Sequence, residues 1–316
     1  MFFRDPMKVY SQSAMEYLMT YGWSILIIAV VLSALSFLGV FNPLTFTPKA
    51  SPGSCHVVRP FGANTTTDIN IEGTCNNQIP QYVGVFNGGF PSSSSYDSDS
   101  VIVSEGSGIS GTNFPFTIVM WVKPSSTQDW SHSWTLPIIG LNSYQGFGFT
   151  GDSSLVLHRC SSADTCSNSG CGSGTATSSL LFSSQSALNN EWHFIAVSVN
   201  YPDYFFQFDN MTGNVSNSNS YSSKLGVSIG TQYAQCDGNA YSGMISNVQL
   251  YNSALSANEL NVLYQEGIGG VPINIQNLVG WWPLNGNAND YSGNGNDGIS
   301  TDVNYTGSWY NGYKNP

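Results

Sequence analysis

The longest uninterrupted apolar stretch lies near the start of the chain. No charged residue occurs from Trp23 to Phe41, and large aliphatic residues fill most of positions 25–32. A helix that is apolar on every side is stable only when lipid or other apolar helices surround it. A helix over residues 12–42 would be about 45 Å long, and a bilayer core is about 30 Å thick. The pattern predicts a long N-terminal hydrophobic α-helix that can span a membrane and ends before Pro43.

After this helix, apolar residues recur in short clusters between polar turns rich in Gly, Ser and Asn. The two strongest clusters are Phe116–Val122 and Trp192–Val199, where β-branched and aromatic residues dominate. Many short strands joined by such turns predict a mainly-β protein, specifically an antiparallel jelly-roll β-sandwich. The other expected strands are residues 82–86, 137–141, 146–149, 155–158, 179–182, 204–208, 225–229 and 244–251.

One segment after the strands has the pattern of a surface helix. Residues 256–265 begin with Ser256, a residue type that caps helix N-termini, and Glu259 follows three positions later, as in a capping box. Gly267 then provides a stop signal. The sequence therefore predicts one short helix after the last of these strands.

Composition divides the remaining chain into a linker region and one large domain. Residues 43–80 begin with a proline-containing stretch and then hold Cys55 and Cys75, so we expect a linker and a small cysteine-containing cap. Residues 81–316 carry the strand pattern and are expected to form one jelly roll. The formal net charge of −11 disfavours binding to nucleic acid, whereas neutral glycans or cations are compatible with it.

The first 11 residues have the features of a short, removable leader. Arg4 and Lys8 are basic, and Glu16 is an acidic residue at the start of the apolar stretch that follows. Together with the phrase QSAMEYLMTYGW, this arrangement resembles the class III signal of archaeal type IV pilins and archaellins. The resemblance implies cleavage between Ser11 and Gln12 by a prepilin peptidase, although that family usually has Gly where Ser11 stands.

The same resemblance implies a role for Glu16 and a location for the protein. A carboxylate among apolar helices needs a positive partner, and the new α-amino group of Gln12 in a neighbouring copy would supply one. The expected partners are copies of the chain or other pilins, with the membrane before assembly. Arg4 and Lys8 favour an N-terminus on the cytoplasmic side of the membrane. The jelly-roll domain is therefore expected at the cell surface or in an extracellular filament. The alternative is an ordinary membrane anchor with Glu16 at its interface.

Six cysteines lie beyond the helix, and an even number outside the cell predicts disulfides. Cys55 and Cys75 close a short loop and form the favoured pair, while the pairing of the others stays open. These others are Cys160, Cys166, Cys171 and Cys236. N-glycosylation sequons begin at Asn64, Asn210, Asn214 and Asn304.

Three further stretches carry a second resemblance. They are FTIVMWVKP at 116–124, NNEWHFIAVSVN at 189–200 and ISNVQLYNSALSANELNVLYQEG at 245–267. They resemble successive landmarks of the laminin-G-like, concanavalin A-like jelly roll, which implies that fold over residues 81–268 and fits recognition of a surface glycan. Loop aromatics would then stack on sugar rings, unless they are packing residues. These aromatics are Tyr96, Trp130, Trp134 and Tyr144.

One landmark is out of order. LVGWWPLNGNANDYSGNGNDG, at residues 278–298, resembles the strand and loop that commonly open this domain, yet here it follows the last strand. We predict a circular permutation in which residues 269–316 supply the first strand and a tail. Alternate residues of that strand should face the core. The two pairs to choose from are Trp282 with Leu284 and Trp281 with Pro283. A truncated second repeat or an exposed tail is the alternative.

The loop at residues 285–297 is dense in oxygen ligands. Asp290 and Asp297 offer carboxylates, and the asparagines and glycines between them offer amide and backbone oxygens. Calcium prefers about six to eight such oxygens. In the second family a calcium often lies near this loop and near the start of the last strand, here at Asn247. The resemblance implies a calcium site formed by Asp290, Asp297 and Asn247. The alternative is that the loop residues simply form turns.

The sequence gives less support to an enzyme. Glucanases of this fold usually carry Glu-x-Asp-x-Glu in one strand, a run that this chain lacks. Asp97 and Asp99 alternate but lie in a serine-rich loop, and His193 is expected to be structural. We therefore expect no catalytic residue and predict a lectin-like pilin subunit for adhesion or glycan recognition. The alternatives are a membrane-anchored glycan-processing enzyme and an archaellin-like motility subunit.

Overall fold

The structure is a computed structural model of the 316-residue chain. It describes residues 14–37, 49–76, 78–88, 100–103, 110–112, 115–128, 136–142, 145–150, 154–159, 176–181, 188, 190–218, 222–224, 227–231 and 241–316. The chain divides into two compact units, Met1–Pro48 and Lys49–Pro316.

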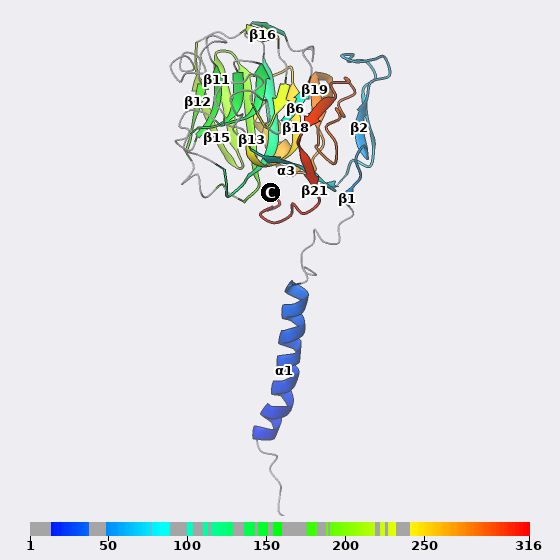
Figure 1. The fold of residues 1–316 in the computed structure, drawn as a ribbon, viewed down its shortest axis with the longest axis vertical. Coiled ribbons are helices and arrows are strands. Elements are labelled where there is room, and N and C mark those ends of the chain that lie inside the picture. Colours follow the sequence, from blue (N-terminus) through cyan, green and yellow to red (C-terminus); the bar gives the residue numbers. More distant parts are fainter. Residues whose placement is uncertain are drawn as a thin grey trace, which may run out of the picture. The chain divides into compact units, whose positions relative to one another are not determined.

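The first unit contains α1, a helix of 24 residues from Ala14 to Phe37 (Figure 1). The expected hydrophobic helix is present, and its large apolar side chains from Tyr21 to Leu32 are exposed around the helix axis. Glu16 lies in the first turn. Within the part of the chain that the structure describes, no helix combines the length and the hydropathy of a membrane span.

The second unit is a sandwich of two sheets. One sheet comprises β6 (Ser100–Val103), β9 (Leu136–Asn142), β10 (Gln145–Phe149), β11 (Ser154–Arg159), β12 (Ala176–Leu181), β17 (Val227–Ile229) and β20 (Gly298–Thr301). The other comprises β5 (Val83–Asn87), β8 (Phe116–Pro124), β13 (His193–Asn200), β14 (Asp203–Phe208), β15 (Met211–Ser216), β18 (Ser242–Tyr251), β19 (Leu278–Trp282) and β21 (Asn304–Thr306).

The strand order explains how the two layers are built. The first sheet runs β12-β11-β10-β9-β17-β6-β20, and the second runs β15-β14-β13-β8-β18-β5-β21, with β19 also paired to β18. Every pairing in both sheets is antiparallel. A small pair, β7 (Ser110–Thr112) and β16 (Ser222–Lys224), stands apart from them. The predicted mainly-β antiparallel sandwich is confirmed.

Strand β8 shows why the strongest predicted strand lacks an apolar–polar alternation. All nine of its residues are buried. Ile118, Met120 and Val122 belong to the core between the sheets, whereas Val119 and Trp121 belong to a second apolar cluster on the outer face of the sheet. The strand is central in its sheet and covered on both faces, so every position favours an apolar residue.

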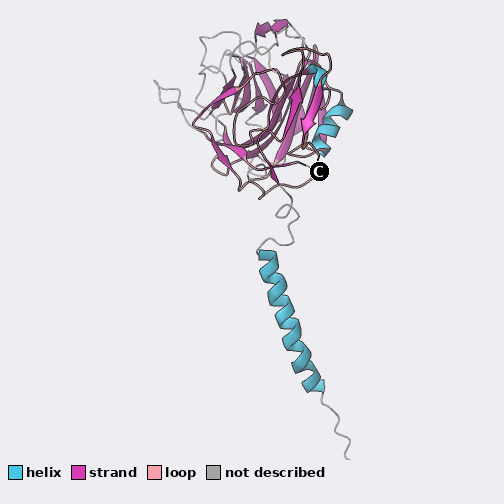
Figure 2. Ribbon diagram, turned by 90° about the vertical axis from the view of Figure 1, so that its right-hand side faces the viewer, coloured by secondary structure: helices cyan, strands magenta, loops and turns pink. Residues whose placement is uncertain are grey.

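Helix α3, from Ala257 to Gln265, covers that outer face with two buried leucines (Figure 2). Ser256 caps the helix, because its side chain accepts a hydrogen bond from Glu259 N while the Glu259 carboxylate accepts one from Ser256 N. Gly267 follows with φ +77°, a conformation that glycine adopts readily because it has no Cβ. The predicted helix, its capping box and its stop are confirmed.

The residues after α3 complete both sheets. A 3-10 turn, η2 (Ile275–Asn277), leads into β19, which pairs with the second half of β18 so that Trp282 lies opposite Val248. β20 and β21 extend β6 and β5 at the sheet edges. Trp282 and Leu284 lie in the core between the sheets, while Trp281 lies in the outer cluster. The strand expected here is confirmed, and the alternative of an exposed tail is wrong.

The segment before the sandwich packs against this C-terminal part. Its strands are β1 (Lys49–Ala50), β2 (Cys55–Val58), β3 (Asn70–Gly73) and β4 (Ile79–Pro80). β1 pairs parallel with β4, and β2 and β3 form a hairpin. The predicted disulfide between Cys55 and Cys75 is present in that hairpin. Val57 N donates to Tyr291 O at 2.8 Å, so the hairpin is tied to the loop that follows β19.

Three edge strands were missed by the sequence pattern. β15, β20 and β21 each end a sheet, and most of their residues are exposed or half-buried. Their sequences therefore lack the apolar alternation that marks a strand with one face in the core. Several predicted residues lie outside the described part of the chain: Ser11, Gln12, Tyr96, Asp97, Asp99, Trp130, Trp134, Tyr144, Cys160, Cys166, Cys171 and Cys236.

Candidate functional site

The loop after β19 is organised around one carboxylate. Asp290 Oδ1 accepts hydrogen bonds from Trp281 N at 2.9 Å and Ser292 N at 2.8 Å. Oδ2 accepts from Ser292 Oγ at 2.7 Å and Asn296 N at 2.9 Å. Burial raises the pKa of Asp290, and these hydrogen bonds oppose the rise because they favour the charged form. Asp290 thus accepts one hydrogen bond from β19 and three from its own loop, which holds the loop to the strand.

The other predicted metal ligands belong to the same network. Asp297 Oδ1 accepts from Asp290 N at 2.8 Å, so these two acids are neighbours. Asn247 lies on β18, where its Oδ1 accepts from Trp281 Nε1 at 2.8 Å and from Gln249 Nε2 at 3.0 Å. The side-chain oxygen of Asn247 is therefore engaged by two N–H donors.

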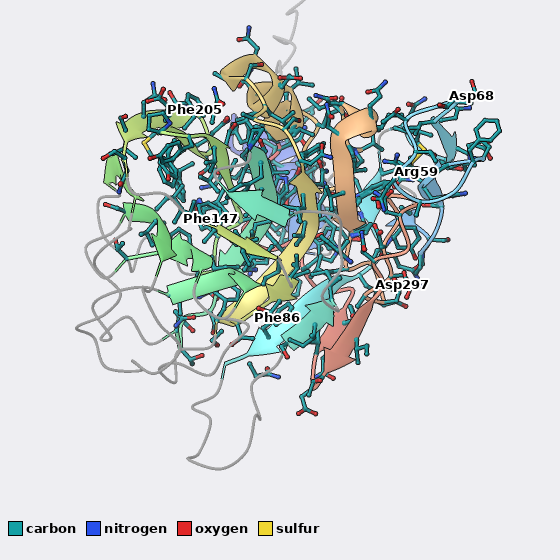
Figure 3. The ribbon with its side chains drawn as sticks, turned by 90° about the horizontal axis from the view of Figure 1, so that it is seen from above. Arg59, Asp68, Phe86, Phe147, Phe205 and Asp297 are labelled. Carbon is teal, nitrogen blue, oxygen red and sulfur yellow. A yellow bond between two sulfur atoms is a disulfide. The ribbon has the colours of Figure 1, made fainter. Side chains whose placement is uncertain are left out.

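A cation of the protein itself lies beside this network. Arg59, just after β2, is 8% exposed and donates to Ser292 O at 3.0 Å, Ile275 O at 2.9 Å and Leu278 O at 3.0 Å. Burial lowers the pKa of Arg59, and the charge of Asp290 opposes that shift. Arg59 and Asp297 lie toward the same side of the unit, away from Phe205 (Figure 3).

These residues do not fit a calcium cage. Calcium needs about six to eight oxygens that face one point, but the oxygens of Asp290 and Asn247 already accept hydrogen bonds from N–H and O–H groups. The nearby guanidinium of Arg59 would repel the ion. Among the described residues, no three His, Cys, Asp or Glu side chains lie together as a metal site. The geometry fits the alternative, in which the loop residues form turns.

His193 stands at the start of β13 with a specific partner. Its Nδ1 lies 2.9 Å from Asp209 Oδ2, and its ring stacks on Phe208 with 4.8 Å between ring centroids. Asp209 Oδ1 also accepts from Phe194 N at 2.8 Å. The pair joins the start of β13 to the end of β14, which is a structural role.

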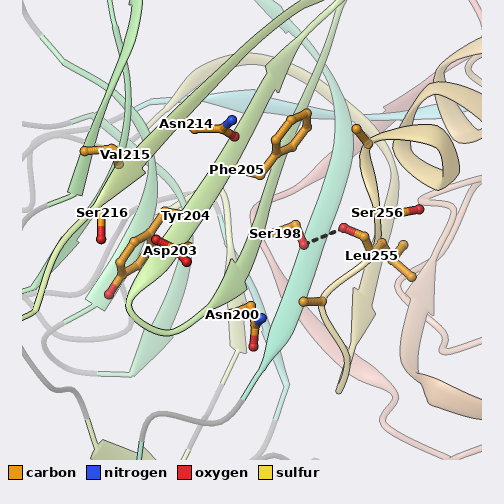
Figure 4. A pocket seen from close by; sticks show the side chains of 12 residues that line it. Ser198, Asn200, Asp203, Tyr204, Phe205, Asn214, Val215, Ser216, Leu255 and Ser256 are labelled. Carbon is orange, nitrogen blue, oxygen red and sulfur yellow. Dashed lines mark hydrogen bonds between the residues drawn. The ribbon is translucent and has the colours of Figure 1, made fainter.

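A groove lies on the outer face of the second sheet, at the edge formed by β13, β14 and β15 (Figure 4). Its volume is about 560 Å³. Alternate residues of a strand share a face, so the residues of these strands that point away from the core line the groove. They are Ser198, Asn200, Asp203, Phe205, Asn214 and Ser216, and residues 254–257 form the facing wall.

Strand register arranges these six side chains in two rows. Ser198 lies opposite Phe205, and Phe205 lies opposite Asn214. The second row consists of Asn200, Asp203 and Ser216, in the same strand order. Neighbouring rows are about 7 Å apart, because each row advances two residues along a strand. The register therefore places a polar row directly beside the row that contains the aromatic ring.

The wall of the groove is fixed to its floor by hydrogen bonds. Ser198 Oγ donates to Leu255 O at 2.7 Å, as drawn in Figure 4. Leu255 N donates to Thr117 Oγ1 at 2.8 Å, and Thr117 Oγ1 donates to Ser253 O at 2.8 Å. The connection between β18 and α3 is thus held against β8 and β13, and the groove is preformed.

The floor of the groove offers side chains that have no partner within the described structure. Asn200, Asp203 and Asn214 are exposed, and none of their side chains forms a hydrogen bond with another described residue. Phe205 is half-buried, with Asn214 opposite it on β15 and with Asp203 and Asn200 in the neighbouring row. Unengaged amide and carboxylate groups beside an aromatic ring suit a ligand that has both hydroxyl groups and an apolar face.

Sequence reasoning did not find this groove. Two of its residues carry a local sequence signal, Asn214 as a sequon and Ser256 as a helix cap, and neither signal indicates a groove. Asn214 is exposed, as are the other sequon asparagines Asn64, Asn210 and Asn304. The available signal was polar residues at alternate positions of consecutive strands. That signal was incomplete because β15 had not been recognised as a strand.

A family model described as the concanavalin A-like lectin/glucanases superfamily matches residues 95–261, more than half of the chain. The chain belongs to the concanavalin A-like lectin/glucanase superfamily. Membership agrees with the antiparallel sandwich and with the three landmark stretches in β8, β13 and β18–α3. The matched part ends before β19, β20 and β21, which nevertheless complete the sheets of this superfamily fold.

Several solved structures resemble the chain at low identity. A putative carbohydrate-binding protein from Bacteroides ovatus is 12% identical with TM-score 0.49, covering 75% of this chain and 67% of that one. The heptameric SAP-like pentraxin of Limulus polyphemus is 13% identical with TM-score 0.46, covering 72% and 94%. The CBM40 domain of the Ruminococcus gnavus IT-sialidase, bound to α2,3-sialyllactose, is 12% identical with TM-score 0.38, covering 57% and 98%. No curated protein sequence matches the chain.

Proposed function

We propose that this member of the superfamily is a lectin-like subunit of a cell-surface filament and that the β13–β15 groove binds a glycan. One observation carries the glycan part. Asn200, Asp203 and Asn214 are exposed, unengaged within the described structure, and grouped around Phe205 in a preformed groove. Polar side chains normally acquire partners when a ligand covers them, so this group fits a ligand rich in hydroxyls.

The chemistry of a sugar matches the two rows of the groove. A pyranose has an apolar face that can rest on the ring of Phe205 and a rim of hydroxyl groups. The amides of Asn200 and Asn214 both donate and accept hydrogen bonds, and the carboxylate of Asp203 accepts them. An open groove of this kind gives modest affinity for one copy, and repeated copies on a filament would raise the avidity.

A panel of immobilised glycans tests the binding site with the full chain. Phe205→Ala should weaken binding about tenfold or more, since a lost stacking contact of about 1.4 kcal/mol corresponds to a factor of ten. Phe61→Ala is the matched control, because Phe61 is an aromatic residue that is 66% exposed in the β2–β3 hairpin. Equal binding by wild type and Phe205→Ala would exclude the groove. Absence of binding across the panel would remove the glycan function itself.

The same panel addresses the enzymatic alternative. Hydrolysis of a glycosidic bond by paired acids needs two carboxyl groups about 5 to 10 Å apart. Asp203 is the one carboxylate among the described residues that line the groove. We therefore expect bound oligosaccharides to be recovered intact, and a shortened product in the wild-type reaction that Asp203→Asn abolishes would overturn the binding-only function.

The filament part of the proposal is carried by α1. Its exposed apolar side chains, from Tyr21 to Leu32, need cover, and copies of the same helix would supply it. Glu16 in the first turn would pair with the α-amino group of Gln12 in a neighbouring copy, after a prepilin peptidase removes residues 1–11. Assembly through α1 would leave the sandwich at the cell surface.

Electron microscopy and N-terminal sequencing of the native protein test this part. We expect the mature chain to start at Gln12 and the Glu16→Ala variant to be processed but not assembled. Glu72→Ala removes an exposed glutamate in the hairpin and should assemble normally. Filaments at normal yield from Glu16→Ala, or a retained Met1 in assembled filaments, would contradict the proposal.

A further inference from the structure

We infer that the β13–β15 groove selects neutral glycans and discriminates against glycans that carry a carboxylate or sulfate. This inference rests on the proposed glycan-binding function and concerns the class of ligand. It follows from the charges that line the groove, from the occupied N-terminus of α3 in its wall, and from the position of Asp203 relative to Phe205.

The groove contains a negative charge and no described positive one. Asp203 is exposed in its floor, and no Lys, Arg or His belongs to the described lining. An anionic sugar would therefore meet a carboxylate without a compensating cation. At about 4 Å the repulsion between two charges in water corresponds to a factor of about five in affinity, and it is larger where water is partly excluded.

The N-terminus of α3 lies in the wall of the groove, and such an end normally attracts anions. Here the end is already occupied by the helix's own acid. Glu259 Oε2 accepts hydrogen bonds from Ser256 N and Ser256 Oγ, both at 2.8 Å. These bonds lower the pKa of Glu259, which keeps its carboxylate charged at neutral pH. Glu259 is not itself a lining residue, but its carboxylate occupies the helix end, so the wall offers no free anion-binding site.

The position of Asp203 suits a sugar with adjacent free hydroxyls. Asp203 and Phe205 lie on the same face of β14, two residues and about 7 Å apart. A pyranose stacked on Phe205 would direct one edge toward Asp203 and its row neighbour Asn200. A carboxylate has two acceptor oxygens, so it can accept from two neighbouring hydroxyls, and an acidic substituent at that edge would meet it directly.

The test compares a neutral oligosaccharide with its sialylated form, using the full chain and isothermal titration or biolayer interferometry. We expect wild type to bind the neutral form at least about fivefold more tightly. Asp203→Asn should weaken binding of the neutral form and strengthen binding of the sialylated form. Asp302→Asn is the matched control: Asp302 is an exposed residue with φ +54°, a conformation that Asn tolerates, so both affinities should stay unchanged.

Each outcome separates this inference from the proposed function. Wild type that binds the sialylated form as well as the neutral form would overturn the selectivity while the glycan function stands. A neutral preference that Asp203→Asn leaves unchanged would overturn the role of Asp203. Wild type that binds neither ligand, nor any other glycan of the panel, would overturn the proposed function and this inference with it.

Discussion

The indole nitrogen of Trp281 donates a hydrogen bond to the side-chain oxygen of Asn247 at 2.8 Å. The bond joins β19 to β18 near the irregularity where β18 changes its register with β8, and Asn247 adopts φ +52° there. The other end of the same amide donates from Nδ2 to Gly270 O at 2.8 Å. Position 247 therefore requires a side chain that both accepts and donates a hydrogen bond, and an amide does both.

Asn247→Asp should lower the free energy of unfolding by about 2–4 kcal/mol, because it removes the donor to Gly270 O and places a charge at a site that is 6% exposed. Aspartate tolerates positive φ nearly as well as asparagine, so backbone strain does not add to the effect. Denaturant unfolding measures the change. Asn210→Asp, in the exposed turn before β15, should stay within about 0.5 kcal/mol of wild type; an equal loss in both variants would contradict the role of Asn247.

Arg59→Met should destabilise the second unit by about 3 kcal/mol or more. The substitution keeps the apolar stem but removes the guanidinium donors to Ser292 O, Ile275 O and Leu278 O, and it removes the cation beside Asp290. Leu278 O and Ile275 O each keep one other donor, from Asn294 Nδ2 and from Leu278 N. Arg59→Lys keeps the charge without the planar fork and should give an intermediate value.

Thermal unfolding measures the effect of these Arg59 variants, and it also tests whether the loop binds a metal ion. Because Arg59 and backbone donors organise the 285–297 loop, neither calcium nor a chelator should shift the melting temperature of wild type. A bound ion would be shown if a chelator lowers the melting temperature of wild type, calcium restores it, and Asp290→Ala shows no such change. That result would contradict the conclusion that the loop residues do not form a calcium cage.

The capping box of α3 should give a small pH dependence of stability. Hydrogen bonds from the Ser256 backbone and side chain lower the pKa of Glu259 in the folded state. A lowered carboxyl pKa contributes stability above the unfolded value of about 4.3, and that stability is lost as pH falls through the folded pKa. Glu259→Gln should therefore remove about 0.5 kcal/mol at neutral pH and nothing at low pH. Gln265→Ala, outside the capping box, should keep the wild-type dependence of unfolding free energy on pH. A Glu259→Gln curve that runs parallel to the wild-type curve would contradict this account.

A chain that ends at Gly270 should fail to unfold cooperatively. It lacks β19, β20 and β21, so the core loses Trp282 and both sheets gain unpaired edges. The milder substitution Trp282→Ala should cost about 3–5 kcal/mol. Ile299→Ala, on β20 but 72% exposed, is the control and should have little effect. Cooperative melting of the truncated chain at the wild-type temperature would contradict the structural role of these strands.

The permutation itself can be tested by restoring the usual order. Trp309 Nε1 donates to Pro80 O at 3.1 Å, so the end of the chain lies close to the point where the sandwich begins. A rearranged chain with residues 271–316 placed before residue 81 should therefore fold to a similar stability, measured by thermal unfolding. A rearranged chain that fails to fold would count against the permutation.

Some elements are specified by a local signal in the sequence. β8 and β13 are rich in apolar residues because nearly all of their positions are buried, so the strand signal is visible without knowledge of the partner strand. α3 is specified by Ser256, Glu259 and Gly267 within about three helical turns. Cys55 and Cys75 are 20 residues apart in a segment with no other cysteine, and their pairing followed from that proximity.

The groove and the network around Asn247 arise from strand pairing in the folded domain. Ser198, Phe205 and Asn214 become neighbours through the register of three strands, and nothing in the local sequence of any one strand marks them as a group. Asn247 and Trp281 are 34 positions apart, and their hydrogen bond depends on β19 lying beside β18. Pairing between distant strands is a long-range property, so no local window of the chain contains the information that brings these side chains together.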